Sequence, residues 1–147
     1  MIILIPEGMK SSADPLLDIL KESKSIAVVG ISTNPLRASN EIAQYLLDAG
    51  YDVAGVNPGE TEVLGRPCYA RVEDIPGAVD IVDIFRKSED VPPVVESAIR
   101  KGAKVIWMQQ GIENREAAEK AVAAGMIVLM DSCILVEHKK RLRALAR

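Results

Sequence analysis

Short apolar runs alternate with amphipathic stretches along most of the chain. Five runs rich in Val, Ile, Leu and Met are predicted to be strands, at residues 25–29, 52–56, 79–84, 104–108 and 126–130. Nearly continuous apolar runs of this length are typical of strands covered on both faces in a parallel sheet. A further short strand is expected near residues 68–69, within the irregular stretch 57–78.

Helical patterns lie between these runs. The predicted helices are residues 42–49 closed by Gly50, residues 94–99 closed by Gly102, and the segment from Asn114 to Gly125. Asp14 and Pro15 predict the start of a shorter leading helix. Alternating strands and helices predict an α/β fold with a Rossmann-like, doubly wound and mainly parallel sheet. We expect residues 1–147 to form a single domain with its core at about 24–138.

Composition narrows the classes of partner. The chain has 147 residues, and 48% of them are hydrophobic. Because its net charge is −3, we expect neither nucleic acid nor a membrane surface as a partner. The apolar run Met1–Ile5 lacks the length and basic flank of a signal peptide or membrane span, which favours a soluble cytoplasmic protein. Cys68 and Cys133 lie far apart without metal-ligand spacing, so both are expected to be reduced and no metal site is predicted.

The segment after the first long strand is the strongest site candidate. Gly30 ends the strand, and a polar loop with a helix start follows, which is a typical place for phosphate because unpaired N–H groups point out of a helix N-terminus. Neither the GxGxxG fingerprint nor a Walker A sequence is present. The loop offers hydroxyl and guanidinium donors from Ser32, Thr33, Arg37 and Ser39.

Other strand ends supply further candidates. Asn57 and Pro58 follow the second strand, where an NAD-binding protein usually offers Asp or Glu to the ribose. Arg86, Gln109 and Gln110 follow the next two long strands, and we expect them to line a crevice because polar groups at a sheet edge need partners.

Catalytic patterns are poor. His138 is the only histidine and is expected on the surface of a basic C-terminal helix. Cys133 is five residues from His138, so the two are not expected to share a helix face as a catalytic pair. The run Lys139–Arg143 is interpreted as a solvated helix end, with an anion-binding tail as the alternative. No catalytic residue is predicted.

Several of these segments, in this order, are similar to those of the CoA-binding domain family, which also occurs at the start of the succinyl-CoA synthetase alpha subunit. The resemblance covers residues 24–138 and looks closest to small stand-alone members. It is carried by Ala27–Ser32 with Arg37 and Ser39, Val56–Pro58, Val63–Gly65, Asp80–Arg86, Trp107–Ile112 and Met130–Cys133.

The resemblance implies coenzyme A as the cofactor, bound across the strand ends. Gly30, Ile31, Ser32 and Thr33, with Arg37 and Ser39, are then expected to face the phosphates, and Val56, Asn57 and Pro58 to border the adenosine. Ile84, Phe85, Arg86, Gln109, Gln110 and Gly111 are expected to line the remaining cleft. In the synthetases a phosphohistidine from a later domain performs the chemistry, and this chain has no matching histidine.

Three functions stay open at this point. The first is a CoA or acyl-CoA binding protein that acts as a carrier, sensor or subunit, with a partner protein or a second copy. The second is an acyl-CoA-handling enzyme that uses Cys133 as a nucleophile. The third is a sensor that binds NAD or another nucleotide.

Overall fold

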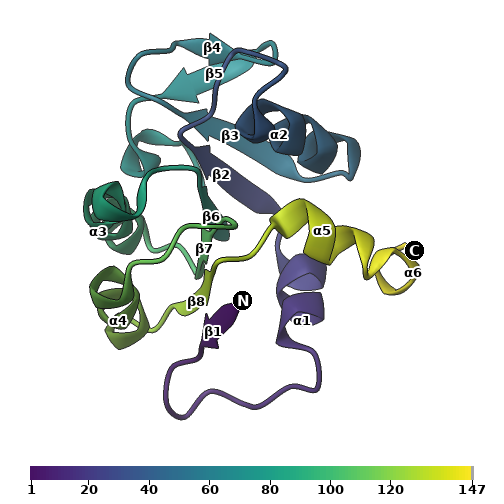
Figure 1. Cartoon of the computed structure of the whole chain (residues 1–147), viewed down its shortest axis with the longest axis vertical. Coiled ribbons are helices and arrows are strands. Elements are labelled where there is room, and N and C mark those ends of the chain that lie inside the picture. The colour runs from purple at the N-terminus through teal and green to yellow at the C-terminus, as the bar shows by residue number, and fades with distance from the viewer. Residues whose placement is uncertain (147) are drawn as a thin grey trace.

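The computed structural model describes residues 1–146 and contains one eight-stranded sheet in the order β1-β8-β7-β6-β2-β3-β5-β4 (Figure 1). The strands are β1 (Ile2–Leu4), β2 (Ser25–Val29), β3 (Asp52–Val56), β4 (Glu62–Val63), β5 (Arg66–Tyr69), β6 (Ile81–Ile84), β7 (Val105–Met108) and β8 (Ile127–Met130). All neighbouring strands pair in parallel except at the two edges, where β1 and β4 run antiparallel to β8 and β5.

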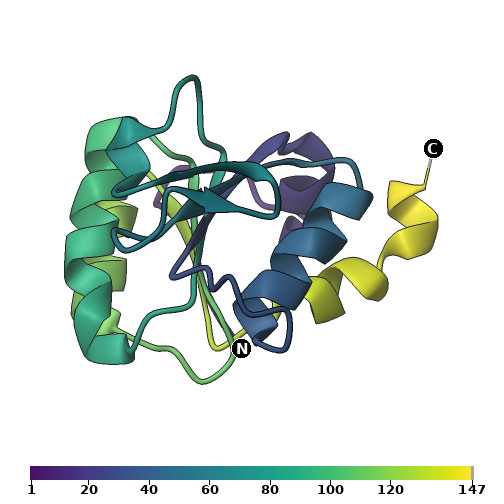
Figure 2. The same ribbon diagram turned by 90° about the horizontal axis from the view of Figure 1, so that it is seen from above.

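Helices cover both faces of the sheet and make three layers (Figure 2). They are α1 (Pro15–Glu22), α2 (Ala38–Asp48), α3 (Val91–Lys101), α4 (Arg115–Ala123), α5 (Ile134–Lys139) and α6 (Leu142–Leu145). The alanine and valine stripes of α3 and α4 pack on one face of the sheet, and α1, α2 and α5 pack on the other. This arrangement confirms the predicted single α/β domain with a doubly wound, mainly parallel sheet.

Local signals placed most elements correctly. β2 and β3 have the predicted bounds, whereas β6, β7 and β8 each begin one or two residues later than predicted. Asp14 and Asn114 cap α1 and α4, because their side chains accept the N–H groups of Leu17 and Ala117. The residues Met1–Ile5 contain the edge strand β1, which was not predicted.

The order of the strands defines where a crevice opens. From β2 the chain proceeds outward to β3 and β5, and then returns to β6 on the other side of β2. The connections that leave the C-terminal ends of β2 and β6 therefore run to opposite faces of the sheet. Ligands of open α/β sheets bind beyond the strand ends at such a switch point.

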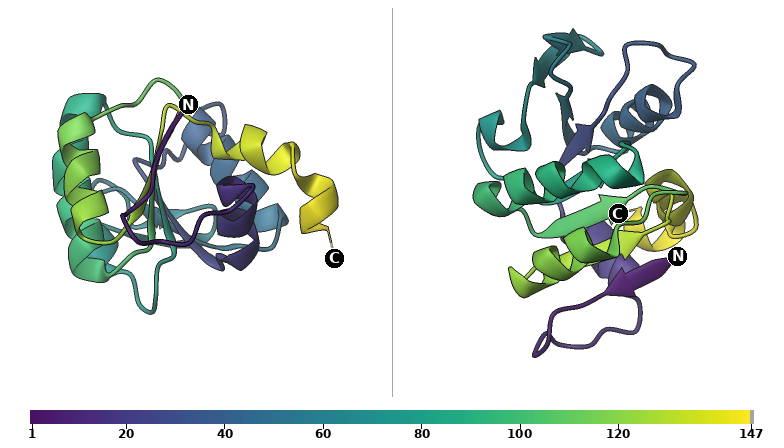
Figure 3. Two further views of the ribbon diagram at one scale, coloured as in Figure 1. Left: turned by 90° about the horizontal axis from the view of Figure 1, so that it is seen from below. Right: turned by 60° about the vertical axis from the view of Figure 1, so that its left-hand side comes forward.

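The predicted solvated helix end is confirmed for Lys139, Lys140 and Arg143, which are exposed, but not for Arg141 or for the histidine before them. His138 is only 5% exposed, and its Nδ1 lies 2.7 Å from the hydroxyl oxygen of Tyr45. The prediction of a surface histidine was wrong, because α5 packs against α1 and α2 (Figure 3) and this burial also lowers the pKa of His138. Arg141 is likewise held in place, since it forms ion pairs with Asp14 and Glu137.

Candidate functional site

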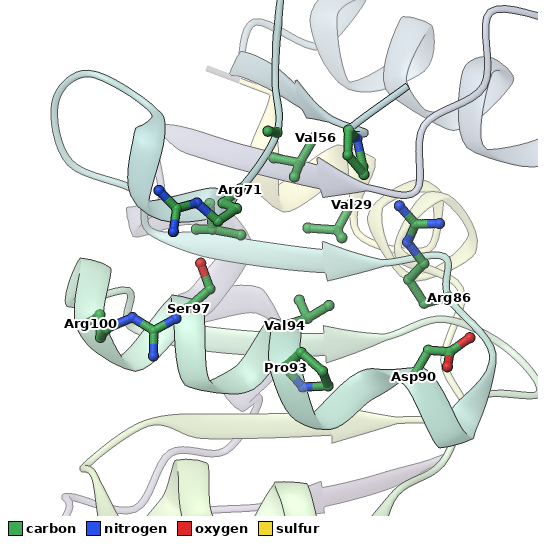
Figure 4. Close-up of a pocket in the computed structure, with 12 residues that line it drawn as sticks. Val29, Val56, Arg71, Arg86, Asp90, Pro93, Val94, Ser97 and Arg100 are labelled. Carbon is green, nitrogen blue, oxygen red and sulfur yellow. The ribbon is translucent and has the colours of Figure 1, made fainter. Parts of the chain in front are cut away.

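A cleft of about 440 Å³ opens at the C-terminal ends of β2 and β3, between α3 and the start of the 3₁₀ turn η1 (Val72–Asp74) (Figure 4). Its floor is apolar and comes from the last residues of two strands, Val29 and Val56, together with Pro93 and Val94 of α3. Pro58, Ala70, Val72 and Ser97 complete the uncharged part of the lining. The cleft lies at the switch point of the sheet.

The charged lining is positive. Arg71, Arg86 and Arg100 line the cleft together with a single carboxylate, Asp90. The whole chain carries a net charge of −3, so this concentration of guanidinium groups is local. A pocket with an apolar floor and a cationic rim suits a ligand that combines an apolar body with anionic groups.

Arg86 is the arginine nearest the strand ends. Among residues 1–146 its side chain makes no ion pair with an acidic residue. Its stem passes close to Gly30, where a Cβ atom would lie 3.5 Å from Cδ of Arg86. The guanidinium group is therefore placed between the cleft and the loop that follows β2.

Gly30 allows the ends of β2 and β6 to come this close. Its φ is +86°, and a Cβ atom there would lie only 2.7 Å from the carbonyl oxygen of Phe85. The N–H groups of Gly30 and Phe85 donate to the carbonyl oxygens of Val56 and Val29, both at 2.8 Å. The positive φ and the close approach of Phe85 thus explain why the residue that follows β2 is glycine.

The polar residues of the loop after Gly30 organise the loop itself. The N–H of Ser32 donates to Oγ of Ser39 at 3.0 Å, and Nδ2 of Asn40 donates to the carbonyl oxygen of Ser32 at 2.8 Å. Ser39 and Asn40 are buried, whereas Thr33 and Arg37 are exposed. Arg37 makes no ion pair within the described part of the chain, so its guanidinium group is available to an anion.

Asn57 joins this loop to the turn after β3. Its Nδ2 donates to the carbonyl oxygen of Ile31 at 2.8 Å, and its Oδ1 accepts the N–H of Gly59 at 2.9 Å. Both ends of the amide are thus occupied by the backbone. In place of the acidic residue that commonly binds ribose hydroxyls in NAD sites, the chain has a side chain that braces two loops.

The structure brings together only some of the predicted site residues. Val56, Pro58 and Arg86 line the cleft, and the loop containing Gly30, Ser32, Thr33, Arg37 and Ser39 lies at the same edge of the sheet. The side chains of Ile31 and Ile84 are buried in the core, on opposite faces of the sheet. Phe85 is partly buried and packs with the core on the α2 side.

The segment after β7 lies apart from the cleft lining. Gln109 is 4% exposed, and its Oε1 accepts the N–H of Ile134 at the start of α5. Gln110 and Gly111 are exposed, and the N–H of Gly111 donates to Oδ1 of Asp131 at 2.7 Å. Gln109 therefore has an internal partner that explains its polarity at a buried strand end.

The cleft also contains residues that the sequence did not indicate. Arg71 lies in the irregular stretch before η1, and Ser97 and Arg100 lie on α3. The apolar stripe of α3 marks only its buried face, so nothing local shows that its flank faces η1. Packing of α3 against η1 makes this wall of the cleft.

The structure also bears on membrane insertion, metal binding and thiol chemistry. Within residues 1–146 no helix is long and apolar enough to cross a membrane, and no group of three His, Cys, Asp or Glu side chains is placed to hold a metal ion. Cys68 and Cys133 are both free thiols, and burial raises the pKa of Cys68.

Some of the proteins to which the chain is similar are of about its own length, and others are much longer. YneT, an uncharacterised protein of Bacillus subtilis, is 43% identical over 121 residues, which cover 82% of this chain and 90% of that protein. A solved structure of a hypothetical protein from Pyrococcus horikoshii is also 43% identical and has a TM-score of 0.85, with 91% of this chain and 99% of that chain covered.

The larger relatives are ligases. An ADP-forming acetate–CoA ligase of Archaeoglobus fulgidus is 36% identical over 121 residues, but this chain covers only 18% of its length. The family model of the CoA binding domain matches residues 24–139. The chain therefore belongs to the CoA-binding domain family.

Proposed function

We propose that this protein binds coenzyme A or an acyl-CoA across the C-terminal ends of β2, β3 and β6. The observation that carries the proposal is the apolar cleft with three arginines in its lining, at the switch point of a CoA-binding domain. Coenzyme A combines an adenine base with a diphosphate and a ribose phosphate, so both the apolar floor and the positive rim have counterparts in it.

Each part of the CoA molecule is assigned to residues whose side chains or backbone suit its polarity and charge. Val56 and Pro58 border the adenosine, while Asn57 holds the turn in place. The loop Gly30–Thr33 with Arg37 and Ser39 faces the diphosphate, and Arg86 supplies a further guanidinium group from the side of the cleft. Backbone at Ile84, Phe85 and Gln109–Gly111 continues the same edge of the sheet toward the thiol end.

A binding role fits better than independent catalysis. His138 is buried against Tyr45 rather than paired with a nucleophile. Relatives that carry a ligase name are several times longer than this chain, which spans only 18% of the length of one of them. We therefore assign the protein as a CoA carrier, sensor or subunit in the cytoplasm, with a protein partner or a second copy to receive or report the bound state.

Recognition of NAD in place of CoA is disfavoured by Asn57. Its amide is occupied at both ends by backbone groups, so it has no free acceptor pair for two ribose hydroxyls. The one carboxylate among the residues that line the cleft, Asp90, lies beside Arg86 and away from Val56 (Figure 4).

Calorimetric titration with CoA, acetyl-CoA and NAD tests the proposal. We expect CoA and acetyl-CoA to bind with micromolar to millimolar affinity and NAD to bind at least tenfold more weakly. Arg86→Ala should reduce CoA affinity about tenfold, or about 1.4 kcal/mol, whereas Arg143→Ala should not change it, since Arg143 is exposed on α6 away from the cleft. Equal affinities for CoA and NAD would contradict the assignment.

A further inference from the structure

The positive charges of the cleft lie at its two ends. Arg86 and Asp90 lie at the end formed by the connection from β6, and Arg71 and Arg100 lie together at the opposite end (Figure 4). Val29 and Val94 lie between these ends, so the middle of the cleft is apolar. A ligand with one anionic group would leave one of the two ends unused.

Two carboxylates of η1 organise the Arg71–Arg100 end. Asp74 accepts from Nε and Nη2 of Arg71, at 3.4 and 3.2 Å. Glu73 of η1 accepts from Arg100, with Nη2 at 2.9 Å from Oε1, and lies 3.8 Å from Nη1 of Arg71. Oγ of Ser97 donates to the same Oε1 at 3.2 Å. Hydrogen bonding from Arg100 lowers the pKa of Glu73. Glu73 thus holds Arg100 beside the cleft, and Asp74 holds Arg71.

Both guanidinium groups keep unused donors. Their side chains are 63% and 55% exposed for Arg71 and Arg100, respectively. A guanidinium group has five N–H donors. Arg100 uses only Nε and Nη2 in its contacts with Glu73, and Arg71 uses only Nε and Nη2 in its contacts with Asp74. Glu73 itself is not part of the cleft lining, whereas both arginines are. The pair can therefore contact a second anionic group without losing its internal support.

We infer that Arg71 and Arg100 bind a phosphate on the ribose of the nucleotide, apart from the diphosphate at the loop and Arg86. The inference rests on the proposed CoA site and names what that site selects: a nucleoside diphosphate that also carries a ribose phosphate. In coenzyme A this group is the 3′-phosphate. Arginine suits the role because its planar fork matches phosphate oxygens.

The occupied amide of Asn57 supports this selection. A carboxylate at the end of β3 would bind free ribose hydroxyls and repel a phosphate on the same ring. Asn57 is neutral, and its oxygen is turned to the N–H of Gly59. The side of the cleft that faces the ribose therefore presents cations without an opposing acid at this position.

Titration with CoA, dephospho-CoA and ADP tests the inference. The proteins compared are the wild type, the double variant Arg71→Gln/Arg100→Gln, and the control variant Arg143→Gln, which removes an exposed arginine outside the cleft. We expect the wild type and Arg143→Gln to bind CoA at least tenfold more tightly than dephospho-CoA. The double variant should bind both with similar affinity, at the level that dephospho-CoA shows with the wild type. Circular dichroism confirms that each variant is folded.

A second variant probes the carboxylate that supports Arg100. Glu73→Gln removes the negative charge beside Arg100 but keeps a side-chain oxygen that can accept from it, while Asp74 still holds Arg71. We therefore expect CoA to bind two- to fivefold more tightly and dephospho-CoA to be unaffected. Equal binding of CoA and dephospho-CoA by the wild type, or equal losses for both in the double variant, overturns the inference while the CoA site stands. Failure of all three nucleotides to bind the wild type overturns the proposed function itself.

Discussion

At Gly30 two independent constraints exclude any side chain. The backbone has a φ of +86°, which residues with a side chain adopt at a cost of about 1–2 kcal/mol. In addition, a Cβ atom would lie 2.7 Å from the carbonyl oxygen of Phe85. Gly77 has a similar φ of +79° but no atom within 4 Å of a Cβ position. A comparison of the two positions therefore distinguishes the cost of the positive φ, which both share, from the cost of a steric clash with the backbone, which only Gly30 would have.

We expect Gly30→Ala to lower the free energy of unfolding by about 3 kcal/mol or more, and Gly77→Ala by only about 1 kcal/mol, because only Gly30 adds a collision to the strain. Urea denaturation of both variants measures the difference. Similar losses in the two variants would mean that the ends of β2 and β6 can separate without cost.

Asp83 is a second residue with an unusual environment. Its side chain is fully buried in β6 between Val28 of β2 and Trp107 of β7, and neither carboxyl oxygen has a hydrogen-bond partner among the described residues. Burial without a partner raises the pKa of Asp83 well above its usual value. The native protein therefore holds Asp83 in its neutral form at higher pH than the unfolded chain does.

This difference has a defined sign. Above the unfolded pKa of about 4, the native state binds more protons than the unfolded state, so Asp83 makes stability fall as pH rises until the native pKa is reached. We expect Asp83→Asn to remove this fall. Urea denaturation from pH 4 to 8 should show the wild type losing stability relative to the variant by up to about 1.4 kcal/mol per pH unit. Parallel curves would show that Asp83 is ionised in the native protein.

At the scale of elements, the loop after β2 and helix α2 act as one unit. Ser39 and Asn40 of α2 hold Ser32 by hydrogen bonds, and the helix begins after Arg37, whose side chain makes no capping bond. Arg37 thus stands directly at the N-terminus of α2, and its side chain is exposed. An anion held there receives both the helix dipole and a charged hydrogen bond.

Arg37→Ala should weaken CoA binding by about tenfold, a loss of about 1.4 kcal/mol, and leave the melting temperature of the free protein unchanged because the side chain is exposed and unpaired within the described chain. Arg37→Lys should recover part of the affinity, since it keeps the charge without the planar fork. Titration with CoA at moderate salt measures this, with Arg143→Ala as the control. Unchanged affinity in Arg37→Ala would place the diphosphate elsewhere.

At the scale of the whole molecule, the described residues that line the cleft include neither a cysteine nor a histidine. Cys133 precedes α5, and the histidine of α5 is buried beneath Tyr45 and Tyr51. His138 contacts both tyrosine rings edge-on, which accounts for its place in the packing between α2 and α5.

We accordingly expect acetyl-CoA to remain intact when incubated with the protein, and the rate of thiol release to equal that of buffer. Cys133→Ser should not change this rate. The same samples should show a higher melting temperature with ligand, because a ligand at 100 times its Kd adds about 2.7 kcal/mol of stability. Thiol release that disappears in Cys133→Ser would favour the enzyme alternative.

Local sequence patterns were enough to predict the order and type of most elements and the loop that follows β2. β2 and β3, the caps at Asp14 and Asn114, and the glycine after β2 all follow from hydrophobic runs and turn chemistry, which are local properties. The edge strand β1 escaped prediction because its pairing partner is β8, more than a hundred residues away along the chain.

Packing between distant segments determines which polar residues line the cleft and which have partners within the fold. Arg71 and Arg100 reach one cleft because α3 packs on η1, while Gln109 and His138 are turned inward toward α5 and α2. Each of these outcomes depends on the partner that a side chain meets across the sheet or between helices. A polar residue has the same local pattern whether its partner is a ligand, water or another segment of the chain.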